Sequence, residues 1–251
     1  MKKILSEDRI NYQNYRFGYC VNIILEEDDS IEKAFERGYL PYTGNAKNTE
    51  EIYYLARSVR INLSRYVRLS ENKSVIKKIK SSLNISVDEH KKENFNHDNK
   101  FEKFCIKYSK ERFSNESLSD KRLQLIIKRE NYNKIYEFKS DNNPIGYVIT
   151  FSNNNIIHYW FSFYDTKYLE SMPIGKFMME HIIHRAKKND KKYIYLGTCY
   201  GEDSLYKVRD FKGIEYFDGN EWIDDIEKLK SICKIDPKSV SYTHLRAHET
   251  R

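Results

Sequence analysis

Three groups of residues have types and spacing that suit the binding of an anion. The most concentrated is the basic segment, residues 57–80, which holds eight basic side chains and one acid, Glu71. This segment alone carries +7, the formal net charge of the whole chain. Arginine can grip a phosphate bidentately, and each phosphate contact adds a salt-sensitive increment to affinity. The alternative is a solvated strand face followed by an ordinary basic helix. The basic residues are Arg57, Arg60, Arg65, Arg68, Lys73, Lys77, Lys78 and Lys80.

The other two groups lie in the second half of the chain. Residues 171–177 precede a periodic apolar run, so Gly175 and Lys176 stand at the expected start of a helix, where backbone amides bind anions. The alternative is that Gly175 only permits tight packing of this helix on a sheet. Residues 206–211 interleave basic and aromatic side chains just beyond the short strand 193–197, and open α/β sheets bind ligands at such strand ends.

The spacing of the cysteines and histidines disfavours metal and disulfide chemistry. The cysteines stand at positions 20, 105, 199 and 233, too far apart for a CxxC pair, so we expect reduced thiols in a cytoplasmic protein. His181 and His184 lie three residues apart without an evident third ligand, and they are interpreted as a partly buried surface pair. We therefore expect no metal and no cofactor.

The composition is that of a folded chain without a membrane span. Charged residues make up 32% of 251 residues, but aromatics reach 14%, more than disordered chains contain. The longest charge-free stretch, residues 142–164, includes five Asn and one Pro and is interpreted as two strands with a turn. The net charge fits a nucleic-acid partner, and Lys-rich coding bias is the alternative. Residues 239–251 resemble translated adapter sequence and are set aside; a genuine polar tail is the alternative.

Hydrophobic patterning predicts a small N-terminal α+β module over residues 1–90. Ser30 is expected to cap a short helix that Gly38 ends, and the hydroxyl of Ser70 is expected to cap a basic helix. Between them the pattern predicts a turn-rich link at residues 39–45 and a strand over residues 53–69. The polar stretch 88–100 is the predicted boundary.

Residues 91–238 are predicted to form a second domain with a mixed sheet and flanking helices. Two helices, three strands, a helix and a strand follow one another, which is the core order of the GNAT acyltransferase fold. Those enzymes hold the pyrophosphate of acyl-CoA through a Gly-x-Gly loop. Gly175 has the right place, but Phe177 stands where the second glycine would be and disfavours acyl-CoA. Lys176 and the helix end suit another anion, such as an RNA terminal phosphate. The predicted helices are at 101–108, 118–127 and 174–188, and the strands at 134–138, 145–151, 156–163 and 193–197.

Several motifs, in order, resemble the arginyl/leucyl-tRNA-protein transferases of the N-end rule. In the second half these are HYWFSFYD at 158–165, GKF at 175–177, YIYLG at 193–197 and YKVR at 206–209. Upstream, RGY at 37–39 and the stretch from RSVR at 57–60 to SENK at 70–73 resemble the N-terminal domain of that family. The family's Cys-Gly-Tyr-Cys element reads FGYC at 17–20, and one thiolate cannot hold a metal or cluster.

The resemblance implies a GNAT-like fold and transfer of an amino acid, Arg or Leu, from aminoacyl-tRNA to the N-terminal amine of an acceptor protein, a tag for protein degradation. It implies that the basic segment binds tRNA, that Asp165 orients or deprotonates the amine, and that Tyr206 hydrogen-bonds the carbonyl or ribose. Lys207 and Arg209 would neutralise terminal phosphates. The remaining substrate-binding residues implied are Tyr164, Gly175, Lys176, Tyr195 and Gly197.

Two other functions are left open by the sequence. One is a GNAT N-acyltransferase that uses acyl-CoA, and the other is a non-catalytic RNA-binding relative of the fold. For the aminoacyl transferase the expected partners are aminoacyl-tRNA and a protein or peptide N-terminus, with no membrane and a monomeric chain.

Overall fold

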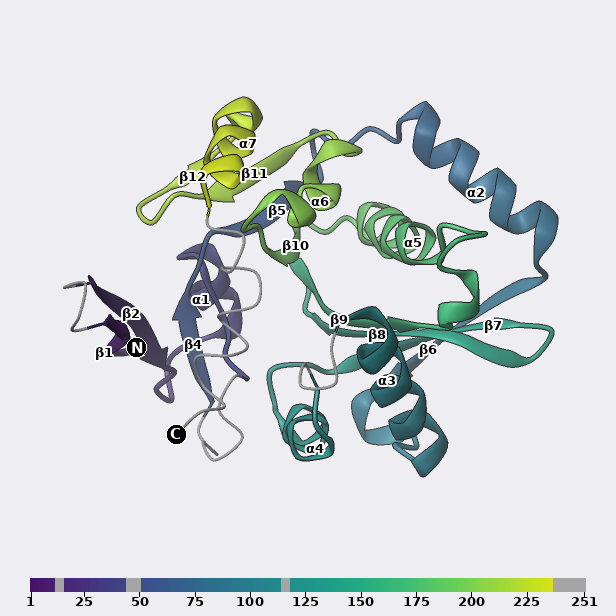
Figure 1. Ribbon diagram of the computed structural model, residues 1–251, viewed down its shortest axis with the longest axis horizontal. Coiled ribbons are helices and arrows are strands. Elements are labelled where there is room, and N and C mark those ends of the chain that lie inside the picture. Colours follow the sequence, from purple (N-terminus) through teal and green to yellow (C-terminus); the bar gives the residue numbers. More distant parts are fainter. Residues whose placement is uncertain (12–15, 44–50, 114–117, 237–251) are drawn as a thin grey trace. The chain divides into compact units, whose positions relative to one another are not determined.

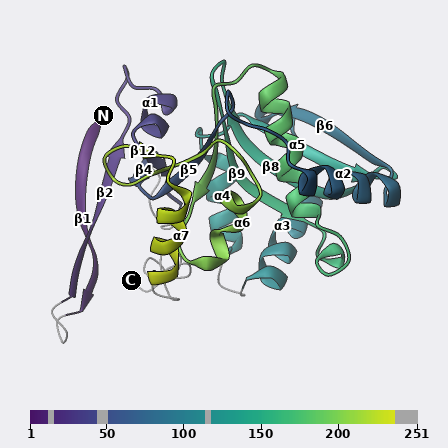
Figure 2. The same cartoon turned by 90° about the horizontal axis from the view of Figure 1, so that it is seen from above.

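The computed structural model describes residues 1–11, 16–43, 51–113 and 118–236 (Figures 1 and 2). The chain forms two compact units, and neither is continuous in sequence. Unit 1 comprises Met1–Val59, Gly197–Arg209 and Glu215–Arg251, and unit 2 comprises Arg60–Leu196 and Asp210–Ile214. This division differs from the boundary expected at residues 88–100, because β6 (Ile85–Lys91) pairs along its length with β7 (Lys134–Ser140). The predicted tail at 239–251 lies outside the described residues.

Unit 1 contains an antiparallel sheet in the order β1-β2-β4-β3. Beside it, α1 (Ile31–Glu36) begins after Ser30, whose hydroxyl accepts a hydrogen bond from the Lys33 amide at 3.2 Å, as predicted. The expected link at 39–45 is wrong in its first part, because β3 pairs with β4. The strands are β1 (Lys2–Asn11), β2 (Arg16–Ile24), β3 (Tyr39–Pro41) and β4 (Ile52–Leu55).

The C-terminal part of unit 1 contains the short helices α6 (Tyr206–Arg209) and α7 (Ile226–Ile235), together with the hairpin of β11 (Ile214–Phe217) and β12 (Trp222–Ile223). Gly38 has a φ of +79°, and a Cβ there would collide with the ring of Phe217. Only glycine therefore allows the end of α1 to approach this hairpin so closely.

The sheet of unit 2 runs in the order β5-β10-β9-β8-β7-β6. The single strand expected over 53–69 is two strands, β4 and β5 (Ser58–Asn62), separated at Ala56 and Arg57. β8 (Asn143–Ser152) pairs antiparallel with β7 and β9, whereas β9 (Ile156–Tyr164) and β10 (Tyr193–Thr198) are parallel. These last three strands were predicted, and the mixed sheet is the one expected for an α+β acyltransferase fold.

Helices cover both faces of this sheet, and the alternation along β8 decides which residues they bury. Tyr147 and Ile149 pack into a core with α3 (Asn99–Arg112) and α4 (Asp120–Lys128). Gly146, which directly precedes Tyr147 in β8, faces the other side of the sheet. A Cβ at this position would lie 2.6 Å from the sulfur of Met178 on α5 (Ile174–Lys188). Figure 1 shows α5 and α2 (Ser70–Ser82) on one side of β6–β9 and α3 with α4 on the other.

The cap expected at the start of α2 is wrong. The residue in the capping position is Leu69, which makes no side-chain hydrogen bond, and the hydroxyl of Ser70 donates to the Glu71 carboxylate instead. Ser70 has helical geometry, so it already belongs to the first turn and its side chain cannot reach the amides that a cap would satisfy.

Candidate active site

The parallel pairing between β9 and β10 is short. Within the described residues it joins residues 193–195 to residues 156–158 and ends at Tyr195↔His158, while β9 continues to Tyr164. The carboxyl-terminal half of β9 therefore lacks β10 as a neighbour. Ligands of open α/β sheets bind where adjacent strands part at their carboxyl ends, so this is the part of unit 2 in which a substrate site is expected.

The start of α5 lies against the end of β9. A Cβ on Gly175 would approach Cε1 of Tyr164 to 2.9 Å, so the helix can sit this close only with glycine at that position. Tyr164 is also held by Tyr108, with ring centroids 4.7 Å apart. Phe177 is 3% exposed and packs edge-on against Phe138. The packing role that was the alternative for Gly175 is therefore present in the structure.

Lys176, expected to bind an anion, forms an ion pair with Asp210. Its Nζ lies 2.6 Å from the Asp210 carboxylate, and both side chains are partly buried. A phosphate would have to compete with this carboxylate for the lysine. Asp210 follows the YKVR motif directly, but the sequence gives no signal that pairs it with a residue 34 positions away.

Asp165 closes the turn that follows β9. Its carboxylate accepts a hydrogen bond from the Lys167 amide at 3.1 Å and caps the short 3-10 helix Thr166–Tyr168. The other carboxylate oxygen lies 3.0 Å from Nζ of Lys167. The carboxylate is thus fixed at the carboxyl end of β9, next to Tyr164. Its role with an amine stays a prediction.

Tyr195 is fully buried and accepts a hydrogen bond from Arg60 at 3.4 Å. The Arg60 guanidinium also lies over the ring of Tyr193, 3.8 Å from its centroid. Two residues of β10 therefore hold an arginine that was expected to contact tRNA. With 8% of Arg60 exposed, most of its charge is directed into the fold.

Four further candidate residues belong to unit 1. Gly197 has a φ of +83°, a left-handed conformation that glycine adopts readily, and it lies within β10 at the unit boundary. Lys207 donates a hydrogen bond to the Thr198 carbonyl at 2.7 Å. Tyr206 is 51% exposed, and Arg209 is also exposed. Tyr206 and Arg209 therefore have side chains accessible to a substrate.

The basic segment separates into two parts. In the arginine part, residues 57–68, Arg57 forms a bidentate ion pair with Asp236 at 2.6 and 3.1 Å. Arg68 donates through Nε to Glu180 at 2.5 Å, and the Glu180 side chain is fully buried on α5. Burial alone would lower the arginine pKa, but in both cases the hydrogen bond and charge of the paired carboxylate raise it overall. These two arginines therefore act as internal counter-ions.

The lysine part, residues 73–80, lies on α2. Lys73, Lys77, Lys78 and Lys80 are all exposed, and Lys78 donates to the Ser171 carbonyl at 2.9 Å. Arg65, in the loop before α2, is exposed as well. The exposed cations of the predicted tRNA surface are thus mainly those of α2. Their contact with tRNA stays a prediction.

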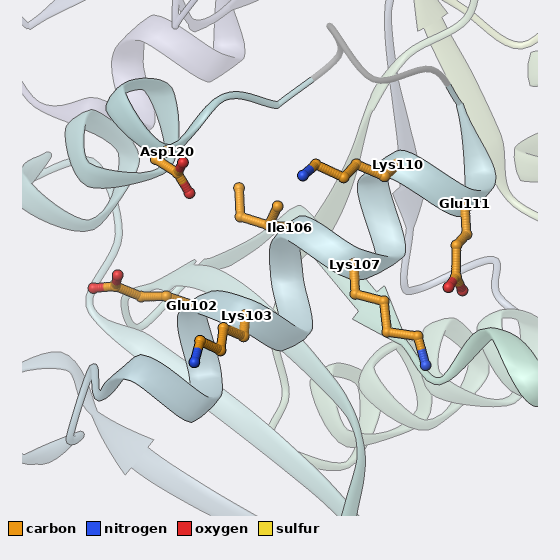
Figure 3. Close-up of a pocket in the computed structure, with 7 residues that line it drawn as sticks. All are labelled: Glu102, Lys103, Ile106, Lys107, Lys110, Glu111 and Asp120. Atoms are coloured by element: carbon orange, nitrogen blue, oxygen red, sulfur yellow. The ribbon is translucent and has the colours of Figure 1, made fainter.

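A surface pocket of unit 2 lies between α3 and α4 (Figure 3). Its lining contains both lysines and acids, and Asp120 of α4 lies across from Ile106 of α3. Gln124 donates to the Glu102 carboxylate at 2.6 Å, so one of the acids is already engaged. A mixed lining of this kind offers no concentrated field for an anion. The lining residues are Glu102, Lys103, Ile106, Lys107, Lys110, Glu111 and Asp120.

Of the two histidines on α5, His181 packs against the core and His184 faces solvent. His181 lies 5.3 Å from the ring of Phe138, and burial, followed by nearby positive charges, lowers its pKa to about 4. His184 is exposed, and burial also lowers its pKa. The expected partly buried pair therefore matches the exposure of the two side chains.

Comparison with known proteins identifies the domain type. Residues 124–212 match the family model described as an acetyltransferase (GNAT) domain. The matched GNAT domain runs from α4 through β10 to the start of the loop before β11, so it includes β9, α5 and the turn between them. The acyltransferase-type fold predicted from the element order is thereby confirmed. No curated protein matches the chain.

Three solved structures are similar to the chain. The C-terminal domain of a putative lysylphosphatidylglycerol synthetase from Agrobacterium fabrum has 7% identity over 61% of this chain, with a TM-score of 0.45. L-PGS from Bacillus licheniformis has 10% identity over 66%, with a TM-score of 0.42. The match spans 49% of each of those two chains. A functionally unknown conserved protein from Staphylococcus epidermidis ATCC 12228 has 12% identity over 76% of this chain and 67% of its own, with a TM-score of 0.36.

Among the described residues, no helix combines the length and apolar character needed to cross a bilayer. The charge-free stretch at 142–164 forms β8 and β9 with a turn between them, as expected.

Proposed function

We propose that this protein is an aminoacyl transferase that moves Arg or Leu from aminoacyl-tRNA to the N-terminal amine of an acceptor protein, a tag for degradation. The observation that carries the proposal is the closed start of α5. Gly175 is packed against Tyr164, and Lys176 is paired with Asp210. Such a turn favours a donor without the pyrophosphate of CoA, while the GNAT domain provides the acyl-transfer fold.

The reaction requires no redox step. The free-base amine attacks the carbonyl carbon of the aminoacyl ester, a C–N bond forms, the ester C–O bond breaks, and the tRNA ribose hydroxyl leaves with the amine's proton. Positioning and stabilisation of the oxyanion are the main contributions a protein can make to this step. In this proposal Asp165 takes up or orients the amine proton and Tyr206 donates to the carbonyl or ribose.

The site assignment is tested by variants that preserve the local structure. Asp165→Asn keeps an oxygen that can accept from the Lys167 amide but removes the carboxylate, so aminoacylation should fall about 100-fold or more. Lys167→Gln removes the ion pair and keeps the carboxylate, so its rate should stay within about threefold of wild type. Tyr206→Phe alters an exposed hydroxyl and should lower the rate without a change in stability. Wild-type rates in both Asp165→Asn and Tyr206→Phe would defeat the assignment.

The donor is tested directly with a pool of labelled aminoacyl-tRNAs and model peptides that differ in their first residue. Transfer of label to the peptide N-terminus is the expected result. Transfer from acetyl-CoA, with no binding of tRNA, would instead support the acyl-CoA function that the domain match favours. Binding of tRNA without transfer from any charged species would support a non-catalytic RNA-binding protein.

A further inference from the structure

Two cysteines that are 34 residues apart in sequence meet in unit 1. Sγ of Cys199, just after β10, lies 3.8 Å from Sγ of Cys233 on α7. Both side chains are buried, with 0% and 1% exposure, and both are free thiols. A disulfide has an S–S distance of about 2.0 Å. The sulfurs must therefore approach by about 2 Å to form a bond, which is within reach of side-chain rotation and a small shift of α7.

Polar groups surround this thiol pair unevenly. The Ser204 hydroxyl lies 3.3 Å from the Cys199 sulfur, and Nη1 of Arg57 lies 3.8 Å from the Cys233 sulfur. The hydrogen bond with Cys233, then that with Ser204 and the charges of Lys207 and Arg57, outweigh burial and lower the pKa of Cys199 to about 7. The same contact between the thiols raises the pKa of Cys233. The contact between the two sulfurs thus favours ionisation of one of them while the other keeps its proton.

Access to the sulfurs depends on α7. This helix has ten residues, and the side chains it buries are Leu229 and Cys233. Its last residue, Ile235, is 82% exposed. The end of the helix is also held by Asp236, which pairs with Arg57 and accepts a hydrogen bond from the Gly201 amide. Local opening of α7, which breaks these contacts, admits a small oxidant to both sulfurs.

We propose that Cys199 and Cys233 form a redox-active dithiol that a peroxide converts to an intramolecular disulfide. The Cys199 thiolate attacks one peroxide oxygen, the O–O bond breaks, and Cys199 becomes a sulfenic acid while the other oxygen leaves as water after protonation. The Cys233 sulfur then attacks the Cys199 sulfur, an S–S bond forms and the second water leaves. The two sulfurs lose two electrons in total, and the peroxide gains them. This modification does not depend on the proposed acyl donor.

The other cysteines are unsuited to the same chemistry. Cys105 is buried in the α3 core of unit 2, and burial raises its pKa well above the usual value. Cys20 is partly exposed on β2, where its sulfur lies 3.6 Å from the Asn22 side chain, so peroxide can reach it, whereas the Cys199 sulfur has that of Cys233 beside it. Disulfide formation should therefore be selective for the pair in unit 1, and Cys105→Ser is a matched control that removes one buried thiol elsewhere.

The test uses the full chain and hydrogen peroxide at neutral pH. Two of the four thiols should disappear from titration in denaturant, and peptide mapping should show residues 199 and 233 in one linked product with the loss of two hydrogen atoms. Dithiothreitol should restore both thiols. The pair should react at least about tenfold faster than Cys105, and the alkylation rate of Cys199 should be half-maximal near pH 7. Cys105→Ser should form the same link.

Cys233→Ser removes the second sulfur and should trap Cys199 as a sulfenic acid that a dimedone probe labels. Wild-type mapping decides the question even if this variant folds poorly. The proposal is overturned if the linked product is missing after Cys105 has been oxidised, or if Cys199 advances to sulfinic acid in the wild type without a link.

Discussion

The two parts of the basic segment differ in what their charges do. In residues 57–68, Arg57, Arg60 and Arg68 are held by a carboxylate, two tyrosine rings and a second carboxylate. In residues 73–80, the four lysines of α2 are exposed. Arginine is suited to the first role because its planar fork satisfies buried partners, and lysine to the second because its ammonium is strongly hydrated. A cluster of charge in sequence is therefore not the same thing as a charged surface.

The contrast has a consequence for nucleic-acid binding. Charges that are already paired release few counter-ions when a phosphate approaches, whereas exposed lysines release them and contribute salt-sensitive affinity. We therefore expect the lysine part to carry any RNA affinity and the arginine part to carry stability.

The largest effect on stability is expected for Arg68→Ala, in the arginine part of the segment. It leaves the fully buried carboxylate of Glu180 with the hydroxyl of Tyr66, which donates at 2.6 Å, but without a cation. The free energy of unfolding, measured by urea denaturation, should fall by about 3–5 kcal/mol. Lys73→Ala, on the exposed face of α2, should change it by less than about 0.5 kcal/mol. Equal effects of the two substitutions would remove the distinction.

Charge reversal on α2 tests the other half. Lys73→Glu, Lys77→Glu and Lys80→Glu together should lower tRNA affinity at least about 100-fold at low salt and flatten its salt dependence, with little change in stability. The matched control reverses Lys103, Lys107 and Lys110, which line the pocket of α3 and are also exposed (Figure 3). Both triple variants change the net charge equally. Equal loss of affinity would show that only the total charge matters.

The pKa of His181 is affected by charges from both parts of the basic segment. Burial is the main cause of its low pKa of about 4, and Lys80 and Arg68 contribute smaller effects. The unfolded chain takes up a proton below about pH 6.5, and the folded chain does so only near pH 4. Stability is therefore present above pH 6.5 and should decline by about 3 kcal/mol as the pH falls to 4. His181→Leu should flatten this decline in denaturation curves across the range. A decline of the same size in His181→Leu would assign it to other groups.

The smallest expected effect is at the junction of the two parts. Ser70 makes no capping bond at the start of α2, so Ser70→Ala should change stability by less than about 0.5 kcal/mol. Ser119 caps α4 by accepting from the Arg122 amide at 3.3 Å, and Ser119→Ala should cost about 1 kcal/mol by thermal denaturation. A larger loss in Ser70→Ala than in Ser119→Ala would restore the cap expected at Ser70.

The elements predicted well from sequence are those with a strong local pattern. The strands β7 to β10 and the helix α5 follow from their apolar periodicity, and the Ser30 cap from its local chemistry. The break at Ala56 and Arg57 was missed because alternation continues across it. β3 was missed because its three residues stand directly before a turn-forming stretch and become a strand only by pairing with β4.

The candidate site shows the same limit more sharply. Sequence placed Gly175 and Lys176 correctly at the start of a helix, but their partners Tyr164 and Asp210 come from other elements. Glu180 and the Cys199–Cys233 pair were not singled out, since each depends on contacts across 34 to 114 residues. The sequence signal for such partners was the basic segment itself. Arginines that lie in or next to a buried strand need internal partners such as carboxylates.

The discontinuous units bear on how the chain is made. The strands β1–β4 leave the ribosome before unit 2, but unit 1 also needs residues 197–209 and the stretch that begins at Glu215. Unit 2 must therefore be synthesised, except for residues 210–214, before unit 1 has its own last segments. Nascent β1–β4 would spend that interval without α7 and the β11–β12 hairpin, exposed to premature association. A message truncated shortly before Glu215 would yield a nearly complete unit 2 joined to an unfinished unit 1.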